Sequence, residues 1–329
     1  MAEIEVVTRK GEVMQEALHI PVGLDRCIAL LSPAIQTSSN PVVLDATLGM
    51  GGHSKALLEK FPNLKIIAID RDASAIEIAT KNLKSFASRI QIVHAVYDEI
   101  SQVLSGLGIE EIDGALFDLG VSSMQLDQAD RGFAYSNDAP LDMRMDQSTG
   151  LSALDILNTY SFGELVRVIR NFGEEKFATK IADNIIKARE AKTLNTTKDL
   201  AEIVKNSIPA PARRTGGNPA KRTFQALRIE VNQELEVLER ALPQAIEALC
   251  LGGRLVVMSY QSLEDKIVKK SFTKVTGSRS PLGLPFDLPN SAASYRLLMN
   301  GSEGASSEEI EINARAQSMR LRALERVAA

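Results

Sequence analysis

A glycine-rich turn after the first apolar run is the segment whose residue types most clearly predict ligand binding. Residues 44–54 have the pattern of a strand, a turn and the start of a helix, and the turn contains Gly49, Gly51 and Gly52. Glycine lets the backbone approach a ligand closely and adopt a positive φ. Asp70 ends the next predicted strand, where a carboxylate can bind both hydroxyls of an adenosine ribose. Together they predict a nucleoside site.

Details of this turn favour a sulfonium nucleoside over a dinucleotide. A dinucleotide fingerprint that starts at Gly49 needs glycine or alanine where Ser54 stands, and one that starts at Gly51 has His53 in place of its second glycine. Asp45, just before the turn, would repel a pyrophosphate but is compatible with a cationic sulfur. The alternative is that both aspartates merely end strands. The turn between them favours binding, so the predicted cofactor is S-adenosylmethionine.

A third aspartate, Asp118, ends the fourth predicted strand and is followed by small residues. It should lie at the crevice where cofactor and substrate meet. There its carboxylate could hold an amine, orient the lone pair of that amine or accept a proton. Amino-directed methyltransferases generally place Asp or Asn here, followed by a Pro-Pro-aromatic run that this chain lacks. We predict Asp118 as the catalytic residue and Tyr97 as a cover for the adenine face, although Tyr97 also fits a core aromatic.

The apolar pattern between residues 40 and 120 predicts an α/β fold with a doubly wound, Rossmann-like parallel sheet. Short β-branched runs alternate there with stretches whose apolar residues recur three and four positions apart, as in amphipathic helices. The expected strands are residues 42–45, 65–70, 90–94 and 114–118, and the expected helices between them are 54–60 and 73–83.

After Ser123 the pattern becomes helical, through residues 151–158, 162–171, 175–190 and 197–207. We therefore expect an inserted all-helical domain at residues 124–233, between a first part (1–123) and a second part (234–329) of the sheet domain. In the second part, a helix from Glu234 should end at a Gly252-Gly253 turn before a strand at 254–259. Residues 277–307 are predicted as a loop, and residues 317–327 as a closing strand, with a helix left open.

Composition narrows the class of protein. The 329 residues are 44% hydrophobic, enough for a large core. No apolar run is long enough to cross a bilayer and the start lacks a secretory pattern, so we expect a cytoplasmic location. Cys27 and Cys250 are far apart and suggest no disulfide framework. The histidines are not spaced as ligands, so no metal site is predicted; they are His19, His53 and His94.

The charge distribution suggests a local contact with a polyanion. A net charge of −4 argues against a protein that binds nucleic acid over its whole surface. The segment 203–229, however, contains no Asp or Glu, which indicates a basic footprint within the helical insertion. A solvated basic loop explains the segment equally well. Its basic residues are Lys205, Arg213, Arg214, Lys221, Arg222 and Arg228.

A series of uncommon strings runs through most of the chain, at residues 19–22, 45–54, 68–72, 118–127, 131–133, 140–146, 173–175, 222–229, 232, 234–235 and 262–265. In this order they make the sequence similar to the bacterial 16S ribosomal RNA small-subunit (cytosine-N4) methyltransferases. The resemblance implies a class I methyltransferase sheet with a helical insertion after its fourth strand. It also implies cofactor contacts at Gly51, Gly52, His53, Asp70, Tyr97, Asp118 and Gln125.

The implied reaction is methylation of the exocyclic N4 of a cytidine in the decoding region of 16S ribosomal RNA, with the small ribosomal subunit as partner and a homodimer left open. Residues 142–146 and the basic segment 213–228 would face the RNA, unless Arg144 pairs with Asp142 or Asp146. Three alternatives stay open: a methyltransferase for another substrate, a non-catalytic assembly factor and a nicotinamide-dependent oxidoreductase.

The sequence departs from the family pattern at three places. Tyr97 stands where phenylalanine is common, which preserves stacking. Tyr260 and Gln261 replace the usual Phe-His pair, so a role that the family gives to that histidine has no counterpart here. Ala314 replaces a proline, a change expected to affect a turn rather than the chemistry.

Overall fold

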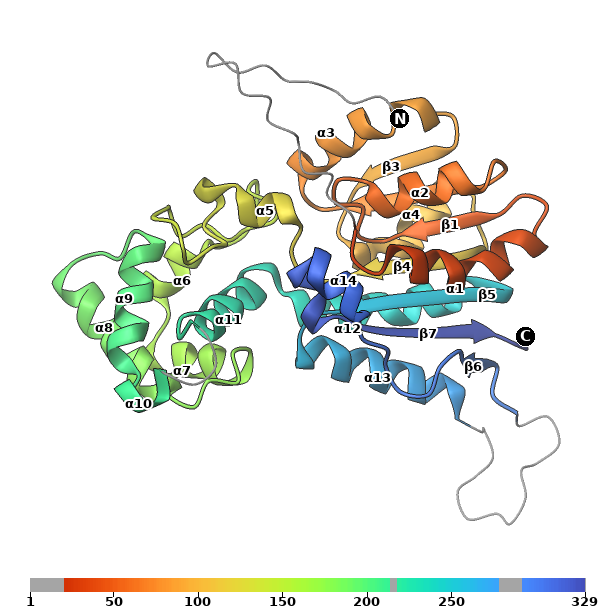
Figure 1. The fold of residues 1–329 in the computed structure, drawn as a ribbon. Coiled ribbons are helices and arrows are strands. Elements are labelled where there is room, and N and C mark those ends of the chain that lie inside the picture. Colours follow the sequence, from red (N-terminus) through yellow and green to blue (C-terminus); the bar gives the residue numbers. More distant parts are fainter. Residues whose placement is uncertain (1–20, 214–217, 278–291, 329) are drawn as a thin grey trace, which may run out of the picture.

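The computed structural model describes residues 21–213, 218–277 and 292–328. His19 and Arg214 lie outside these ranges. The described chain forms a sheet domain covered by helices and a helical lobe beside it (Figure 1). No helix within these ranges combines the length and apolar character needed to span a membrane.

The sheet contains seven strands in the order β3-β2-β1-β4-β5-β7-β6. Strands β1 to β5 run parallel, whereas β7 is antiparallel to both β5 and β6. The four predicted strands of the first part and the closing strand are confirmed. The bounds are β1 (Val42–Asp45), β2 (Lys65–Asp70), β3 (Ile90–His94), β4 (Ile112–Asp118), β5 (Leu249–Ser259), β6 (Tyr295–Leu297) and β7 (Arg320–Arg326).

Two expectations for the second part are wrong. The segment predicted as a loop contains β6, because its residues pair with the edge of β7. The pair Gly252-Gly253 does not end a helix but lies within β5, where Gly252 has φ +83. The register between β4 and β5 shifts there, between Ile112 and Gly114, so these glycines form an irregularity in a strand.

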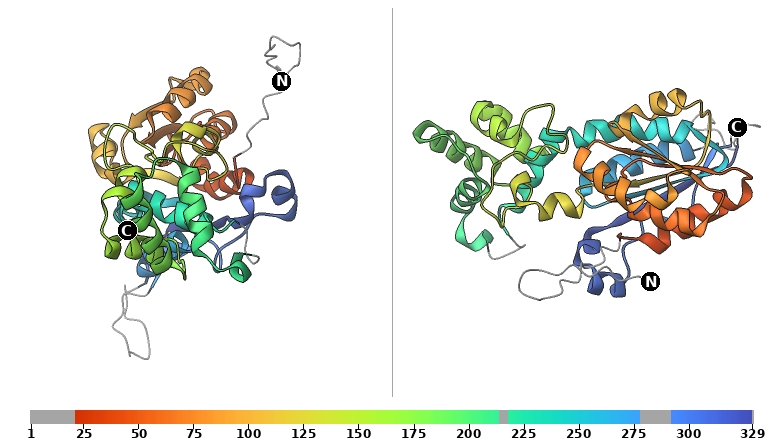
Figure 2. Two further views of the ribbon diagram at one scale, coloured as in Figure 1. Left: turned by 90° about the vertical axis from the view of Figure 1, so that its left-hand side faces the viewer. Right: turned by 90° about the horizontal axis from the view of Figure 1, so that it is seen from above.

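Helices cover both faces of the sheet (Figure 2). Successive strand residues point to opposite faces, so Val43 joins the core under the first group of helices and Leu44 joins the core under the second. The first group is α1 (Leu24–Thr37), α2 (Gly52–Lys60) and α3 (Ala73–Asn82), and the second is α4 (Ile100–Gly106), α12 (Glu234–Glu247) and α13 (Ser262–Thr276). Shorter elements are α14 (Ser307–Ile312), η1 (Lys84–Phe86), η2 (Tyr97–Glu99), η3 (Ala129–Arg131) and η4 (Ala314–Ser318).

The helical lobe has its own hydrophobic core, separate from the two cores of the sheet domain. Ser152, Ser161 and Thr196 cap three of its helices in capping boxes. This separate core supports our proposed division at residues 124–233. The elements of the lobe are α5 (Ser123–Asp127), α6 (Ala153–Thr159), α7 (Phe162–Asn171), α8 (Ala178–Ala191), α9 (Thr197–Ser207), α10 (Ala210–Arg213) and α11 (Lys221–Asn232).

Polar contacts join the lobe to the sheet domain beside the carboxyl ends of the strands. Gln225 Nε2 donates to Gln261 Oε1 at 2.8 Å, and Lys266 Nζ lies 3.1 Å from Glu174 Oε1. The backbone passes from α11 to α12 through Gln233, whose φ is +51. The lobe therefore lies next to the end of the sheet at which an open α/β fold binds its ligands.

Candidate functional site

The glycine-rich turn joins β1 to α2 and needs glycine for two reasons. Gly51 caps α2 with φ +84, a conformation that side chains disfavour. A Cβ at Gly51 would lie 2.7 Å from Cδ1 of the buried Leu83. At Gly52 a Cβ would collide with Pro21. The turn thus keeps backbone amides and the start of a helix open toward the strand ends.

Replacing Gly51 with alanine is expected to lower the affinity for S-adenosylhomocysteine about tenfold. The left-handed conformation of a non-glycine residue costs roughly 1–2 kcal/mol, so the free turn relaxes from it and must regain it to bind the ligand. Calorimetric titration of the pure variant measures this. Gly106→Ala is the matched control, because no heavy atom lies within 4 Å of its added Cβ. Equal affinities for the two variants would contradict the requirement for glycine in the turn.

Asp70 lies at the end of β2 with its carboxylate fixed beside the turn. Its Oδ2 accepts from Gly49 N at 2.7 Å and its Oδ1 accepts from Asp72 N at 2.8 Å. Burial raises the pKa of Asp70, while these amide donors act in the opposite direction. The structure thus brings Asp70 and the glycine turn together, as the sequence predicted.

Asp45, beside the turn, also connects β1 to α2 through hydrogen bonds. It is buried, and it accepts from Ser54 Oγ at 2.6 Å and from Thr47 N at 3.2 Å. Burial raises the pKa of Asp45, against the effect of its bond to Ser54. These bonds tie the first turn of α2 to the end of β1, which fixes the glycine turn between them.

Asp118 ends β4 and faces His53 of α2 and Tyr260, which follows β5. The Tyr260 hydroxyl donates to Asp118 Oδ1 at 2.6 Å. His53 Nε2 lies 3.1 Å from the carbonyl oxygen of Val22, which can only accept, so we assign the ring proton to Nε2. Burial lowers the pKa of His53, which favours the neutral ring. Its Nδ1 lies 3.9 Å from Asp118 Oδ2.

Tyr97 and Gln125 are both tied into the protein. Tyr97 packs edge to face on Phe117, with centroids 5.7 Å apart, and burial raises the pKa of its hydroxyl. That Tyr97 also covers the adenine of the cofactor remains a prediction. Gln125 donates to Asp72 Oδ2 at 2.9 Å and accepts from Ser122 N at 3.1 Å. Its amide therefore supports the site, and its contact with the cofactor also remains a prediction.

The sequence analysis missed a buried ion pair beside the site. Arg131 Nη2 lies 3.0 Å from Asp72 Oδ2, and these side chains are 4% and 3% exposed. The same Nη2 donates to the carbonyl oxygens of Arg144 and Met145. Both residues belong to strings that carry the family resemblance, but nothing local marks them as partners.

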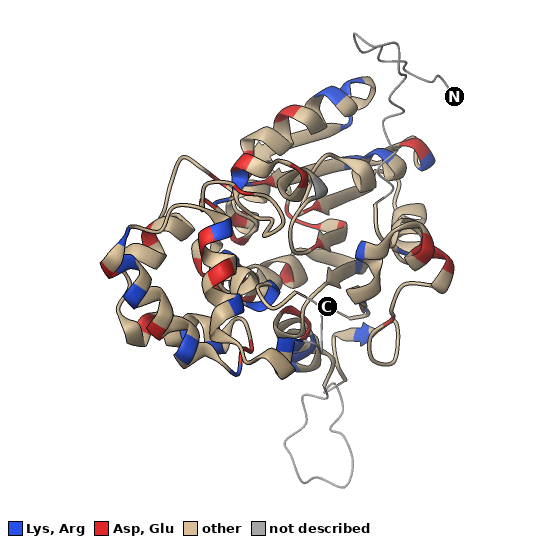
Figure 3. Cartoon of the chain, turned by 60° about the vertical axis from the view of Figure 1, so that its left-hand side comes forward, with Lys and Arg blue, Asp and Glu red and all other residues tan. Residues whose placement is uncertain are grey.

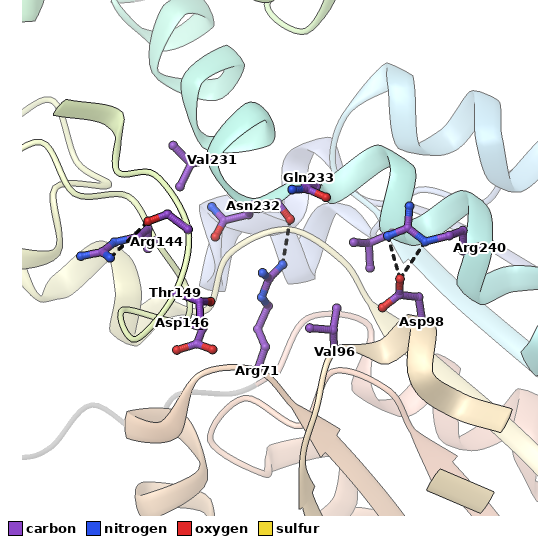
Figure 4. A pocket seen from close by; sticks show the side chains of 12 residues that line it. Arg71, Val96, Asp98, Arg144, Asp146, Thr149, Val231, Asn232, Gln233 and Arg240 are labelled. Carbon is purple, nitrogen blue, oxygen red and sulfur yellow. Dashed lines mark hydrogen bonds and ion pairs between the residues drawn. The ribbon is translucent and has the colours of Figure 1, made fainter. Parts of the chain in front are cut away.

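A cavity of about 200 Å³ lies between the sheet domain and the lobe, and Arg71, the residue after β2, lines it (Figure 4). Arg71 points into it and donates to the carbonyl oxygen of Asn232 at 2.8 Å. Arg240 on its wall pairs with Asp98 at 2.7 Å. The cavity therefore combines arginine side chains with acids and adjoins the end of β2.

The residues expected to face RNA are only partly available. Arg144 pairs with Asp142 at 2.8 Å, which is the internal pairing left open by the sequence. Arg228 is 17% exposed and pairs with Glu234 at 2.8 Å, so the expectation that it faces RNA is wrong. Both its Nε and its Nη2 donate to the Glu234 carboxylate in the first turn of α12. Lys205, Lys221 and Arg222 are exposed.

Within the described ranges, no group of three or more His, Cys, Asp or Glu side chains could hold a metal ion. The site instead offers a glycine turn and three aspartates at strand ends, Asp45, Asp70 and Asp118. Acids around a turn suit a nucleoside with a cationic centre and disfavour a pyrophosphate. The residues present therefore fit S-adenosylmethionine.

Comparison with known structures gives distant similarities. A putative methyltransferase from Streptococcus mutans in complex with SAH is 14% identical, with a TM-score of 0.43 over 93% of this chain and 99% of that chain. An rRNA methylase from Streptococcus thermophilus is 12% identical, with a TM-score of 0.43 over 94% and 98%.

Comparison of sequences gives close relatives. The chain is 57% identical to "Ribosomal RNA small subunit methyltransferase H" of Renibacterium salmoninarum, over 94% of this chain and 95% of that protein. It is 56% identical to the protein of the same name from Pseudarthrobacter chlorophenolicus, over 94% and 96%. The model of the MraW methylase family matches residues 16–327. Because this match spans almost the whole sequence, the chain belongs to the MraW methylase family, and its cofactor is S-adenosylmethionine.

Proposed function

We propose that the protein methylates the exocyclic N4 of a cytidine in the decoding region of 16S ribosomal RNA. The names of its relatives support ribosomal RNA of the small subunit as the substrate. The observation that carries the choice of an amine is Asp118, held at the end of β4 by the Tyr260 hydroxyl at 2.6 Å. A carboxylate accepts hydrogen bonds and so suits an N–H donor.

S-adenosylmethionine supplies an electrophilic methyl group on a sulfonium. Asp70 is placed to accept the ribose hydroxyls at the end of β2, beside the turn that contains Gly49 and Gly51. Asp118 stands across the turn from Asp70, at the end of β4. In this arrangement Asp70 binds the nucleoside and Asp118 binds the reacting amine. Asp118 is also a predicted cofactor contact, because the amine and the methyl group must meet beside it.

The amino group of cytosine is a poor nucleophile, because its lone pair is delocalised into the ring. Orientation is therefore the main contribution that the protein can make, and alignment of reacting groups lowers a barrier by several kcal/mol. Asp118 accepts an N–H of the amine and turns its lone pair toward the methyl group. The N–C bond forms as the bond between sulfur and the methyl carbon breaks, and the cationic amine then loses one proton to the Asp118 carboxylate, which passes it to water.

A base within RNA must be unstacked before it reaches the end of β4. We propose that the helical lobe holds the RNA around this base. Figure 3 shows Lys and Arg distributed along the helices of the lobe and mixed with Asp and Glu, so we expect contacts with a few phosphates rather than a broad basic face. The small ribosomal subunit is the proposed particle, in the cytoplasm, and light scattering on the purified protein would distinguish a monomer from the homodimer left open by the sequence.

Exposed Lys221 and Arg222 at the start of α11 provide a test of the RNA contact. Changing both to glutamate is expected to weaken RNA binding about tenfold and to lower its salt slope by about 1–2, as loss of phosphate contacts does. Filter binding at several salt concentrations measures both values. The control changes Lys60 and Lys65 to glutamate. These exposed residues lie at the end of α2 and the start of β2, at the other end of β2 from Asp70. Equal weakening by both pairs would contradict a local RNA contact.

The proposed reaction is tested by a methyl transfer assay with labelled S-adenosylmethionine on free RNA, assembled small subunits and protein. Mass analysis of the RNA should find one added methyl group on a cytidine. Methylation of another base or of protein would overturn the substrate. Binding of S-adenosylhomocysteine without any transfer would favour the non-catalytic assembly factor.

A further inference from the structure

Tyr260 contacts the Asp118 carboxylate where two neighbouring strands end. Strands β4 and β5 are parallel neighbours, and Asp118 pairs with Met258 in their register. Leu119 N donates to the carbonyl oxygen of Met258 at 3.0 Å, so the two chains still run together where both strands end. The Tyr260 hydroxyl crosses this junction and donates to Asp118 Oδ1 at 2.6 Å.

The surroundings fix the Tyr260 side chain. Its backbone N donates to Glu264 Oε2 at 2.9 Å, which anchors the residue to the first turn of α13. Its ring lies against Gly120, where an added Cβ would be 3.6 Å from Cδ2. Burial, and next the charge of Asp118, raise the pKa of Tyr260, so the phenol keeps its proton and is a donor at neutral pH.

His53 places a second hydrogen-bond acceptor, Nδ1, near the Asp118 carboxylate. Its Nε2 hydrogen is directed to the carbonyl oxygen of Val22, so Nδ1 carries the lone pair of the neutral ring. Among the described residues Nδ1 makes no hydrogen bond, and it lies 3.9 Å from Asp118 Oδ2. A carboxylate oxygen can accept more than one hydrogen bond, so Asp118 Oδ2 and His53 Nδ1 can accept from the same amino group. An exocyclic amine carries two N–H groups and can donate to both.

We propose that Tyr260 is a positioning residue that orients the Asp118 carboxylate. In this orientation Asp118 Oδ2 and His53 Nδ1 accept hydrogen bonds from the two N–H groups of the target amine. The proposal rests on the proposed function, because it assumes that an amino group is methylated. It assigns different tasks to the residues. Tyr260 holds one carboxylate oxygen, while Asp118 and His53 touch the substrate and leave the lone pair of the amine directed away from them.

Tyr260→Phe removes the hydroxyl and keeps the ring. We expect kcat to fall about 10- to 100-fold, the loss of one hydrogen bond to a charged group. The KM for S-adenosylmethionine and the affinity for S-adenosylhomocysteine should change less than twofold. The acidic limb of the pH–rate profile should move to higher pH, because the lost donor favoured the ionised carboxylate. Tyr295→Phe is the matched control, since its hydroxyl donates to the Ile246 carbonyl oxygen, outside the site.

His53→Gln tests the second acceptor. Glutamine can still donate to Val22 but lacks an acceptor at the place of Nδ1, so kcat should fall. Because His53 is also a predicted cofactor contact, the affinity for S-adenosylhomocysteine is measured in parallel, and a fall in that affinity with an unchanged kcat would contradict the acceptor role. Combined with Tyr260→Phe, the loss should be smaller than the product of the single losses, because both changes disturb one amine contact. Fully multiplicative losses would contradict a shared task.

The outcomes distinguish a failure of the positioning role of Tyr260 from a failure of the proposed function. If the wild-type protein methylates cytidine and Tyr260→Phe has an unchanged kcat and pH profile, the positioning role is overturned and the proposed function stands. If kcat and cofactor affinity fall together with the melting temperature, the tyrosine is structural and the positioning role is also overturned. If the wild-type protein methylates no amine, both proposals fail.

Discussion

Asp118→Asn is expected to lower methyl transfer about 100- to 10,000-fold, the range over which positioned acid and base groups act. Asparagine keeps the shape of the side chain but loses its negative charge and one acceptor. The melting temperature should change little, since Asp118 is partly exposed at the end of β4. Single-turnover assays with saturating cofactor and RNA measure the chemical step apart from binding.

The matched control is Asp113→Asn, at the other end of the same strand. Asp113 accepts from Val42 N at 2.7 Å, and an asparagine oxygen can keep that bond. This control should retain wild-type activity. If Asp118→Asn also keeps wild-type turnover under single-turnover conditions, Asp118 does not act on the amine and the mechanism proposed above is wrong.

Arg131→Met is expected to lower the free energy of unfolding by about 3–5 kcal/mol, because it leaves the Asp72 charge buried without its partner. The side chains of this pair are 4% and 3% exposed. Asp72 also caps α3 through Ser74 N and accepts from Gln125, so the loss should extend to the site. Urea unfolding followed by circular dichroism measures the change.

Two further variants distinguish this effect from a general loss of charge. Lys187→Met removes an exposed partner of Asp183 and should leave the free energy of unfolding nearly unchanged, because solvent screens this pair. Adding Asp72→Asn to Arg131→Met removes the stranded charge and should restore part of the lost stability. A double variant as unstable as Arg131→Met alone would show that the buried carboxylate is not the cause.

The sequence allowed good predictions where the signal is local. The glycine turn, Asp70 and Asp118 follow strands whose apolar runs are easily recognised, and parallel strands bring their carboxyl ends to one edge. The amphipathic periodicity likewise predicted the helices of the lobe. Weak periodicity explains the error at β6, which has three residues and exists because β7 offers an edge to pair with.

Long-range partners could not be predicted in this way. Tyr260 and Asp118 are 142 residues apart, and Arg131 and Asp72 are 59 residues apart. Nothing in the neighbourhood of any of these residues specifies the other. Arg228 was predicted to face RNA because the segment 203–229 contains no acids. Its partner Glu234 lies just outside that segment and neutralises its charge. Charge patterns along a chain do not reveal ion pairs across a helix junction.

The placement of the helical lobe between β4 and β5 affects how the protein folds during synthesis. β4 emerges from the ribosome long before β5, its neighbour in the sheet, so one of its edges must wait unpaired while the lobe is made. Helices with local contacts form quickly, whereas pairing between distant strands is slow. The lobe can therefore become ordered first, and the junction that holds Tyr260 beside Asp118 is among the last parts of the native state to form.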